Sequence, residues 1–331
     1  MPKRPVQFAN YVCHFDQLEL LDLFDEIVLP SFLNNNVRQF KETKLFFHDV
    51  RLINLSTRKN EFEPAICGRL VKDTVVHSHQ IYNSGNLIPS KNKMETSPSS
   101  IFTLLLKNHK VIYLQEYSNS PNLDTFRSTS FAFLTKTRNN LVKELSKEIK
   151  GDDRKDKLQK IEKTYPLPTL EVLTLNSDES LEDFISKFSL LQEVSIKMIK
   201  PNNEVNSAKF FNDVRNVSES VGSTNSNLTF RNKEGLTKDS TLNQIKPALD
   251  GNSKVSFKGK DKNENKLSGT NEDFKLTKFM QVIMGNTIEN ARAMLDLFED
   301  ATKDGLIKIP NHTAKEEKLA KVKKSMNSHK K

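Results

Sequence analysis

The sequence predicts an α+β protein of two domains: a mainly antiparallel N-terminal sheet with helices, then a C-terminal α+β sandwich with a long C-terminal helix. Three observations predict this class. Dense apolar strand patterns fill residues 99–136, a highly charged helical pattern follows, and strand and helix patterns then alternate through the second half. The predicted parts are a sheet-rich domain, a charged helical connector, an α+β domain and a basic tail, at residues 1–136, 137–165, 166–311 and 312–331.

The first domain opens with an alternating strand at residues 6–15. A helix is predicted from Asp16 to Leu29, with Asp16 and Glu19 at capping positions and an end before Pro30. The polar face of this helix is acidic. No histidine or second carboxylate cluster converges on it, so we expect a solvated face and not a metal or acid–base site.

Two further strands are predicted at residues 44–55 and 65–79. His77 and His79 share one face of the second strand, and a His-x-His pair at this spacing can bind zinc. No third ligand lies nearby in the sequence, so we expect no metal site there. Residues 83–98 are rich in Asn, Ser, Lys and Pro, a composition that predicts a loop.

The apolar segment contains three predicted strands, at residues 101–106, 111–117 and 130–134. From Thr137 to about Lys163 the pattern is helical and charged.

Gly151 is expected to interrupt this charged helical segment, and a Pro-Leu-Pro run after it places a domain boundary near Tyr165. In the second half, Ser177 is expected to cap a helix. The last helix has a broad apolar face, which must be buried against its own domain or a second subunit. Strands are predicted at residues 170–176, 193–199, 227–232 and 254–260, and helices at 177–190, 208–221 and 274–302.

The composition limits the compartment and the chemistry. Cys13 and Cys67 form neither a disulfide framework nor a metal-ligand pattern, and we find no signal peptide and no apolar run of membrane-spanning length. We therefore expect a soluble cytoplasmic protein with no membrane insertion of its own. No catalytic motif is recognisable, so we assign no catalytic residue, no metal and no cofactor.

The formal net charge is +9, and residues 313–331 contribute +5 of it through seven lysines and two glutamates. Two interpretations of this tail stay open. It is either a solvated, fraying helix end or an arm that binds phosphates and gains affinity by releasing counterions.

A second basic surface is predicted on the strands and loops of the second half. There Phe230 or Phe257 would stack on a base if exposed, although the same alternation fits the solvated edges of a half-buried sheet. The candidate nucleic-acid-binding residues are Lys197, Lys200, Lys209, Arg215, Arg231, Lys233, Lys254, Lys258, Lys260 and Lys262.

The same half carries a family resemblance. The run EVSIKMIKPNNEVNSAKFFNDVRN, the segment NLTFRNKEGL, the basic strand KVSFKGKDKNENKLSG and a terminal helix resemble the RexA family of phage-exclusion proteins. FTLLLKNHKVIYLQEYSNSPNLDTF in the first half is similar to that family's central strands. The resemblance implies a bacterial abortive-infection protein that self-associates, binds DNA and acts with a partner, which can be a membrane protein. It transfers no functional residue.

Three hypotheses follow. The first is a nucleic-acid-binding sensor or regulator in phage defence, with DNA as ligand. The second is a nuclease or other hydrolase, for which His48 with Asp49, or Asp73 with His77, are the candidates. The third is an interaction protein that uses the acidic helix at residues 16–29 and the apolar helix at 274–302 to bind protein partners.

Overall fold

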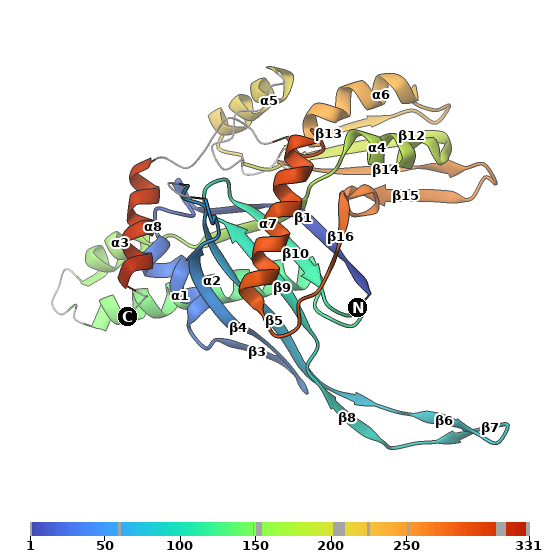
Figure 1. Ribbon diagram of the computed structural model, residues 1–331. Helices are drawn as coiled ribbons and strands as arrows, with labels where there is room; N and C mark the ends of the chain where they lie inside the picture. Colours follow the sequence, from blue (N-terminus) through green and yellow to red (C-terminus); the bar gives the residue numbers. More distant parts are fainter. Residues whose placement is uncertain are drawn as a thin grey trace.

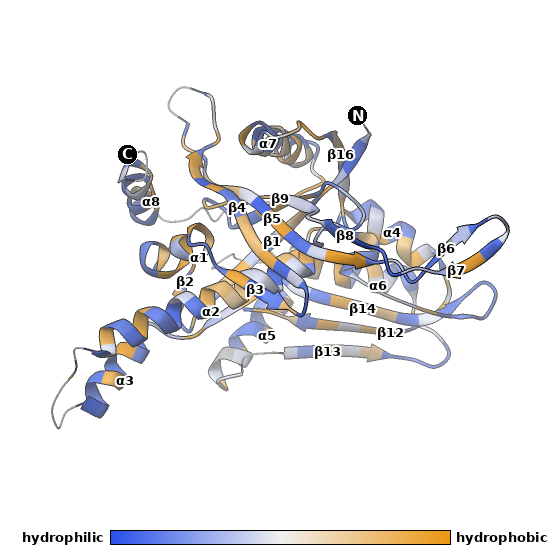
Figure 2. Ribbon diagram, turned by 90° about the horizontal axis from the view of Figure 1, so that it is seen from below, coloured by the Kyte–Doolittle hydropathy of each residue, from blue (hydrophilic) through white to orange (hydrophobic). Residues whose placement is uncertain are grey.

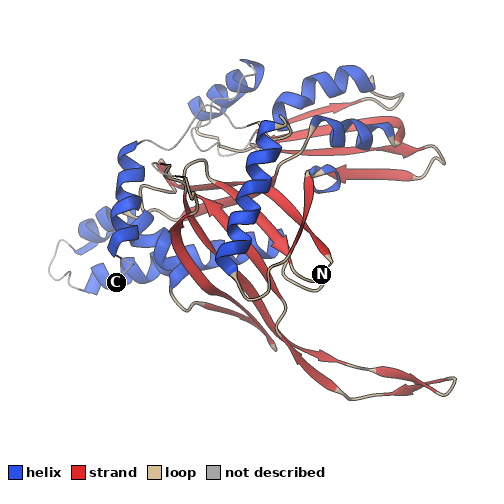
Figure 3. Ribbon diagram, viewed as in Figure 1, coloured by secondary structure: helices blue, strands red, loops and turns tan. Residues whose placement is uncertain are grey.

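The computed structural model describes residues 2–58, 61–147, 149, 154–200, 209–223, 226–249, 252–308 and 316–328. Two antiparallel sheets with helices packed on them make up most of the molecule, which confirms the α+β class (Figures 1 and 3). The larger sheet is ten-stranded. Its main path runs through β11 (Pro168–Thr174), β1 (Lys3–Phe15), β10 (Lys110–Gln115), β9 (Ser99–Leu105), β5 (Pro64–His77), β4 (Thr43–Asn54) and β3 (Val37–Phe40).

Strand β1 is one of the two longest strands of this sheet, and ten of its 13 residues are buried. One of its edges pairs with β10, from Val6 opposite Leu114 onward. Its other edge is shared, because β16 (Thr277–Gln281) pairs with its first half and β11 with its second half. Two segments that are far apart in the sequence therefore meet on one strand.

The larger sheet is covered on both faces, which explains why β1 lacks a polar face. On one face, Tyr11 and Phe15 join a core with α1 (Leu29–Leu33) and α2 (Leu123–Lys147). On the other, Phe8 packs against Phe298 of α7 (Thr287–Lys303). The apolar face predicted for the last helix is thus buried within the same chain.

The smaller sheet and its helices occupy one continuous stretch of chain between β11 and β16. The chain leaves and returns at one place, since Asn176 is bridged to Lys275 and the amide of Leu276 donates to the carbonyl of Leu175 at 2.9 Å. The stretch contains α4 (Asp178–Ser186), β12 (Phe188–Met198), α5 (Lys209–Ser220), β13 (Ser226–Arg231), α6 (Lys238–Ile245), β14 (Ser253–Asp261) and β15 (Lys266–Thr270).

This inserted stretch has a core of its own, in which Phe184, Phe188 and Phe257 pack together. Ser177 caps α4 as expected, accepting the amide of Ser180. A second domain was predicted to start at residue 166, whereas β11, β16 and α7 all lie in or on the larger sheet.

The helix predicted at residues 16–29 is wrong for its first half. Asp16 has a φ of 58° and turns the chain back into β2 (Leu18–Glu19), which pairs with the end of β1. Helical structure begins only at a π-helical segment, Phe24–Val28, and continues into α1. Pro30 lies in the first turn of α1, where the π-helical segment gives way to the α-helix.

The loop predicted at residues 83–98 is also wrong, because these residues form the end of a long hairpin arm (Figure 1). Strands β6 (Gln80–Asn83) and β7 (Asn86–Pro89) are joined by Ser84 and Gly85, both at positive φ, as a two-residue hairpin turn requires. Strand β8 (Lys93–Thr96) then pairs with β5. The polar composition reflects exposure of the arm and not irregular backbone.

Two other predictions are wrong because short patterns were assigned to the wrong period. Residues 130–134 lie inside α2, where Ser130, Phe133 and Leu134 are on its buried stripe. The helix predicted at 274–302 begins only at Thr287, after β16, with Asn286 capping it through the amide of Glu289. The interruption expected at Gly151 lies outside the described residues.

The described part of the basic tail, residues 316–328, is a docked helix. Its helix α8 (Glu316–Ser328) buries Val322 and Met326 in the core formed with α1 and α2. Lys318 Nζ lies 2.7 Å from Glu19 Oε2 and 2.8 Å from Asp22 Oδ1. The acidic surface near residues 16–29 is therefore a docking site for the chain's own tail.

Met326→Ala should lower the free energy of unfolding by about 2 to 4 kcal/mol, because it removes a side chain that is 5% exposed from the core beneath α8. Met94→Ala, at an arm position that is 62% exposed, is the matched control and should change stability by less than about 0.5 kcal/mol. Urea denaturation of both variants tests this. Equal effects would show that α8 does not dock.

Deleting residues 177–274 and closing the gap with a two-residue turn should leave the larger sheet folded, because Asn176 and Lys275 are already bridged. The deleted stretch, expressed alone, should also fold on its own core. Amide NMR spectra and cooperative thermal unfolding of both pieces measure this. Dispersed spectra would establish two domains, whereas collapse of either piece would show that the sheets fold as one unit.

Candidate nucleic-acid interface

One face of the smaller sheet packs on helices, and the other is polar and open. Alternation along β12 sends Val194 and Ile196 into the core and places Glu193, Ser195 and Lys197 on the opposite face. Strand β14 repeats this pattern, with the buried Phe257 flanked by Ser256 and the exposed Lys258. The open face is here defined as the side of this sheet that carries Ser195 and Ser256.

Strand register arranges the open face in rows. One row holds hydroxyl groups from all four strands, namely Thr229, Ser195, Ser256 and Thr270. The hydroxyl oxygens of Ser195 and Thr229 lie 3.0 Å apart. The next row holds Arg231, Glu193, Lys258 and Ser268. Hydroxyls and cations are the side chains that bind phosphate oxygens.

Glu193 is the acidic centre of the open face. Its carboxylate lies 3.0 Å from Lys258 Nζ and 2.6 Å from Arg231 Nη2. Hydrogen bonds from Lys258 and Arg231 lower the pKa of Glu193, so it is ionised at neutral pH. Two of the cations are therefore partly neutralised from within the sheet.

The remaining cations of the open face differ in their pairing. Lys254 forms an ion pair with Glu171 of β11, at 2.8 Å, which also ties this sheet to the larger one. Lys260 faces Lys266 across the β14–β15 pair. Among the described residues, the side chains of Lys197, Lys260 and Lys266 form no ion pair. These three ammonium groups are available to an anionic ligand.

The structure brings together half of the candidate residues. On the open face lie Lys197, Arg231, Lys254, Lys258 and Lys260.

The other five candidates lie elsewhere. Lys200 is tied to the turn after β1 through Gln17, at 2.9 Å. Lys209 begins α5, and Lys233 and Lys262 are exposed in turns. Arg215 is only 9% exposed, so it does not belong to an exposed binding surface.

The two aromatic candidates do not lie on the open face. Phe257 is fully buried, which excludes the stacking role suggested for it. Phe230 is 47% exposed, but it is paired with Val194 and shares the helix-covered side of the sheet. A ligand on the open face would thus meet hydroxyls and cations without an aromatic ring.

Sequence reasoning missed Lys266 and the hydroxyl row. The alternation of Lys266, Ser268 and Thr270 after a short polar turn is the signal that would have identified a hairpin partner for β14. The hydroxyl row had no such signal, because serines and threonines become a surface only when four strands are in register.

Three residues of the histidine sites considered for metal or hydrolytic chemistry have structural partners. His77 Nε2 lies 2.6 Å from Glu42 Oε2 in the β3–β4 turn, while Asp73 accepts a hydrogen bond from Ser97 at 3.0 Å. Asp49 is paired with Arg51 at 3.0 Å. No group of three or more metal-ligating side chains is found among the described residues.

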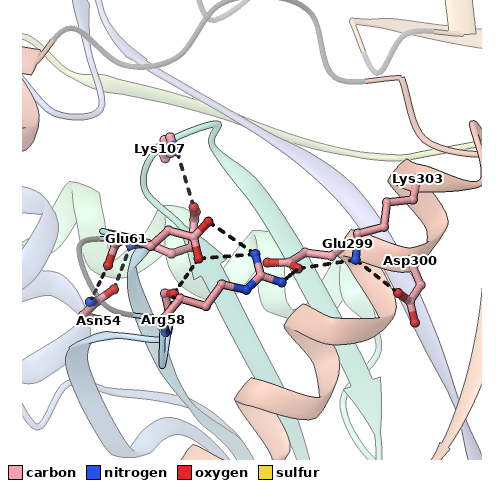
Figure 4. A network of polar contacts seen from close by, with 9 residues as sticks. Asn54, Arg58, Glu61, Lys107, Glu299, Asp300 and Lys303 are labelled. Atoms are coloured by element: carbon pink, nitrogen blue, oxygen red, sulfur yellow. Dashed lines mark hydrogen bonds and ion pairs between the residues drawn. The ribbon is translucent and has the colours of Figure 1, made fainter.

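A second polar cluster lies where the β4–β5 turn meets α7. Arg58 bridges Glu61 and Glu299, at 3.4 Å and 3.2 Å (Figure 4). Beside it, Glu63 is mostly buried, and this burial raises the pKa of its carboxyl to about 7. Lys107, at 3.8 Å, lowers that pKa, whereas the nearby Glu299 and Glu61 raise it.

No known protein-family model matches the sequence, and no match was found among curated proteins. Over the part of the chain that the structure describes, no helix has both the length and the apolar character needed to cross a membrane.

The raised pKa of Glu63 predicts a pH-dependent stability. A carboxyl whose folded pKa exceeds its unfolded value of 4.5 favours folding below that value, and this contribution is lost as the pH rises through about 7. As the pH rises from about 5 to about 8, the free energy of unfolding of Glu63→Gln should therefore increase by about 2 kcal/mol relative to that of the native protein.

Urea denaturation at both pH values measures this difference. Glu95→Gln, at an exposed arm position, is the control and should show no such gain. A constant difference between Glu63→Gln and the native protein across this range would contradict the assignment.

Proposed function

We propose that this chain is a cytoplasmic nucleic-acid-binding protein, with DNA as its ligand, which acts as a sensor or regulator in bacterial defence against phage. The open face of the smaller sheet supports the binding activity, because it presents cations and hydroxyl groups in register. The resemblance to the RexA family supports the defence role, self-association and a partner protein. An enzymatic activity is not part of the proposal.

The chemistry of the open face favours contacts with the phosphate backbone. Ammonium groups that neutralise phosphates release bound counterions, so affinity falls steeply as salt rises. Hydroxyl groups donate to phosphate oxygens without regard to base identity. A face that offers these groups and no aromatic ring is suited to a sequence-tolerant interaction.

Glu193 limits this interaction in our proposal. A phosphate approaching the second row must compete with the Glu193 carboxylate for Arg231 and Lys258. It also meets the negative charge of that carboxylate. Glu193 thereby sets an affinity below the maximum that the cations alone would provide.

The hypothesis of an interaction protein was based on two surfaces, and other parts of the same chain pack on both. Glu19 and Asp22 are engaged by Lys318 of α8. The apolar face of α7, including Met294 and Phe298, is buried against the larger sheet.

Two variants should shift DNA binding in opposite directions. Replacing Lys197, Lys260 and Lys266 together with Gln should weaken binding about tenfold or more and reduce the slope of log affinity against log salt by about two to three. Glu193→Gln should tighten binding severalfold, because it frees Arg231 and Lys258. Fluorescence anisotropy with a labelled duplex between about 50 and 200 mM salt measures both effects.

The control replaces Lys3, Lys91 and Lys93 with Gln, which makes the same change in net charge at exposed positions away from the open face. If this control weakens binding as much as the open-face variant does, the open face is not the interface. If the native protein does not bind at all, the proposed function is wrong.

A further inference from the structure

A helical projection carries a second group of unpaired cations. Buried positions in α2 end at Arg138, and beyond it the helix leaves the body of the protein (Figure 2). The helix α3 (Arg154–Thr164) packs on the end of α2, and none of its residues is buried. Arg138 anchors the base of the projection, because its Nε donates to the carbonyl of Tyr165 at 2.6 Å.

Helix α3 is rich in basic residues. It contains only two carboxylates, Asp156 and Glu162. Its five cations form no ion pair with any described residue, unlike Arg231, Lys254 and Lys258 on the open face. The five are Arg154, Lys155, Lys157, Lys160 and Lys163.

Three of these lysines form a line along the helix. Lys157, Lys160 and Lys163 follow one another at intervals of three residues, so they share one side of α3 over a rise of about 9 Å. Leu158 and Ile161 are the half-buried residues of α3, and each is turned about 100° or more from Lys160, the middle of the line. All three lysines are exposed, and α3 contacts α2.

We propose that Lys157, Lys160 and Lys163 form a second contact with the phosphate backbone of duplex nucleic acid, separate from the open face. This inference rests on the proposed function. A duplex presents a negative charge about every 1.7 Å along its axis, so a line of free ammonium groups can release several counterions. The unpaired state of these lysines means that no intramolecular ion pair must be broken first.

The chemistry of α3 favours a duplex over other anionic partners. A helix that binds a membrane surface needs exposed apolar side chains, and the two apolar side chains of α3, Leu158 and Ile161, are half-buried. Proteins bind single strands through aromatic side chains that stack on the bases, and α3 contains no aromatic residue. The phosphate backbones of a duplex can be bound by cations alone, provided that a rigid element such as a helix holds those cations in place.

The test replaces Lys157, Lys160 and Lys163 together with Gln in the full-length protein and measures binding to a labelled duplex across a salt series. We expect affinity to fall about tenfold and the salt slope to fall by about two to three. The charge-matched control is the Lys3, Lys91 and Lys93 variant. Because the three lysines are exposed and form no ion pair with a described residue, thermal unfolding should change little, which separates a loss of binding from a loss of folding.

A second measurement detects the contact directly. Lysine acetylation read by mass spectrometry should show Lys157, Lys160 and Lys163 protected when duplex is added to the native protein, with Lys91 and Lys93 unprotected. If the native protein binds duplex but the α3 variant matches its control and acetylation is unchanged, the α3 contact is overturned while the proposed function stands. If the native protein binds no duplex, the α3 contact and the proposed function are both wrong.

Discussion

The shared edge of β1 is the constraint on which the architecture depends. One edge of this buried strand pairs with β10 along the chain's central hairpin. The opposite edge must find partners for its backbone groups, since a buried unpaired N–H or C=O is costly. Strands β16 and β11 divide that edge between them, and the stretch that separates them in sequence must leave the sheet and return. The smaller sheet is the part of the chain between these two partners.

Polar contacts then fix the position of the smaller sheet. Lys110 is fully buried, and its Nζ donates to Asn10 of β1 at 3.0 Å, while the Asn10 amide donates to Asn252 before β14 at the same distance. A buried ammonium is tolerated only with such partners. Together with the Lys254–Glu171 ion pair, this link orients the open face relative to the larger sheet. The smaller sheet, which carries the surface proposed to bind DNA, is thus held to the larger sheet by polar contacts of Asn252 and Lys254.

Alternation within strands was the most reliable signal in the sequence. It identified β12, β13 and β14, and five of the ten cations predicted to bind nucleic acid lie on one side of the sheet that these strands form, namely Lys197, Arg231, Lys254, Lys258 and Lys260. Prediction failed where a short stretch fits both the two-residue period of a strand and the 3.6-residue period of a helix. The apolar run at residues 130–134 fits a strand locally, yet Ser130, Phe133 and Leu134 lie on the buried stripe of a helix, because α2 extends well beyond them in both directions. Arg215 was assigned to a surface because sequence alone does not show which side of α5 is covered.

By itself, the sequence determined the α+β class, most strands, the Ser177 cap and the basic character of the second half, because these follow from periodicity, capping chemistry and composition. Only the tertiary structure decided that β11, β16 and α7 complete the first sheet, that the tail docks on Glu19 and Asp22, and which cations stay unpaired. These outcomes depend on contacts between residues that are distant in the chain. Local patterns carry no record of which distant partner satisfies a strand edge or neutralises a charge.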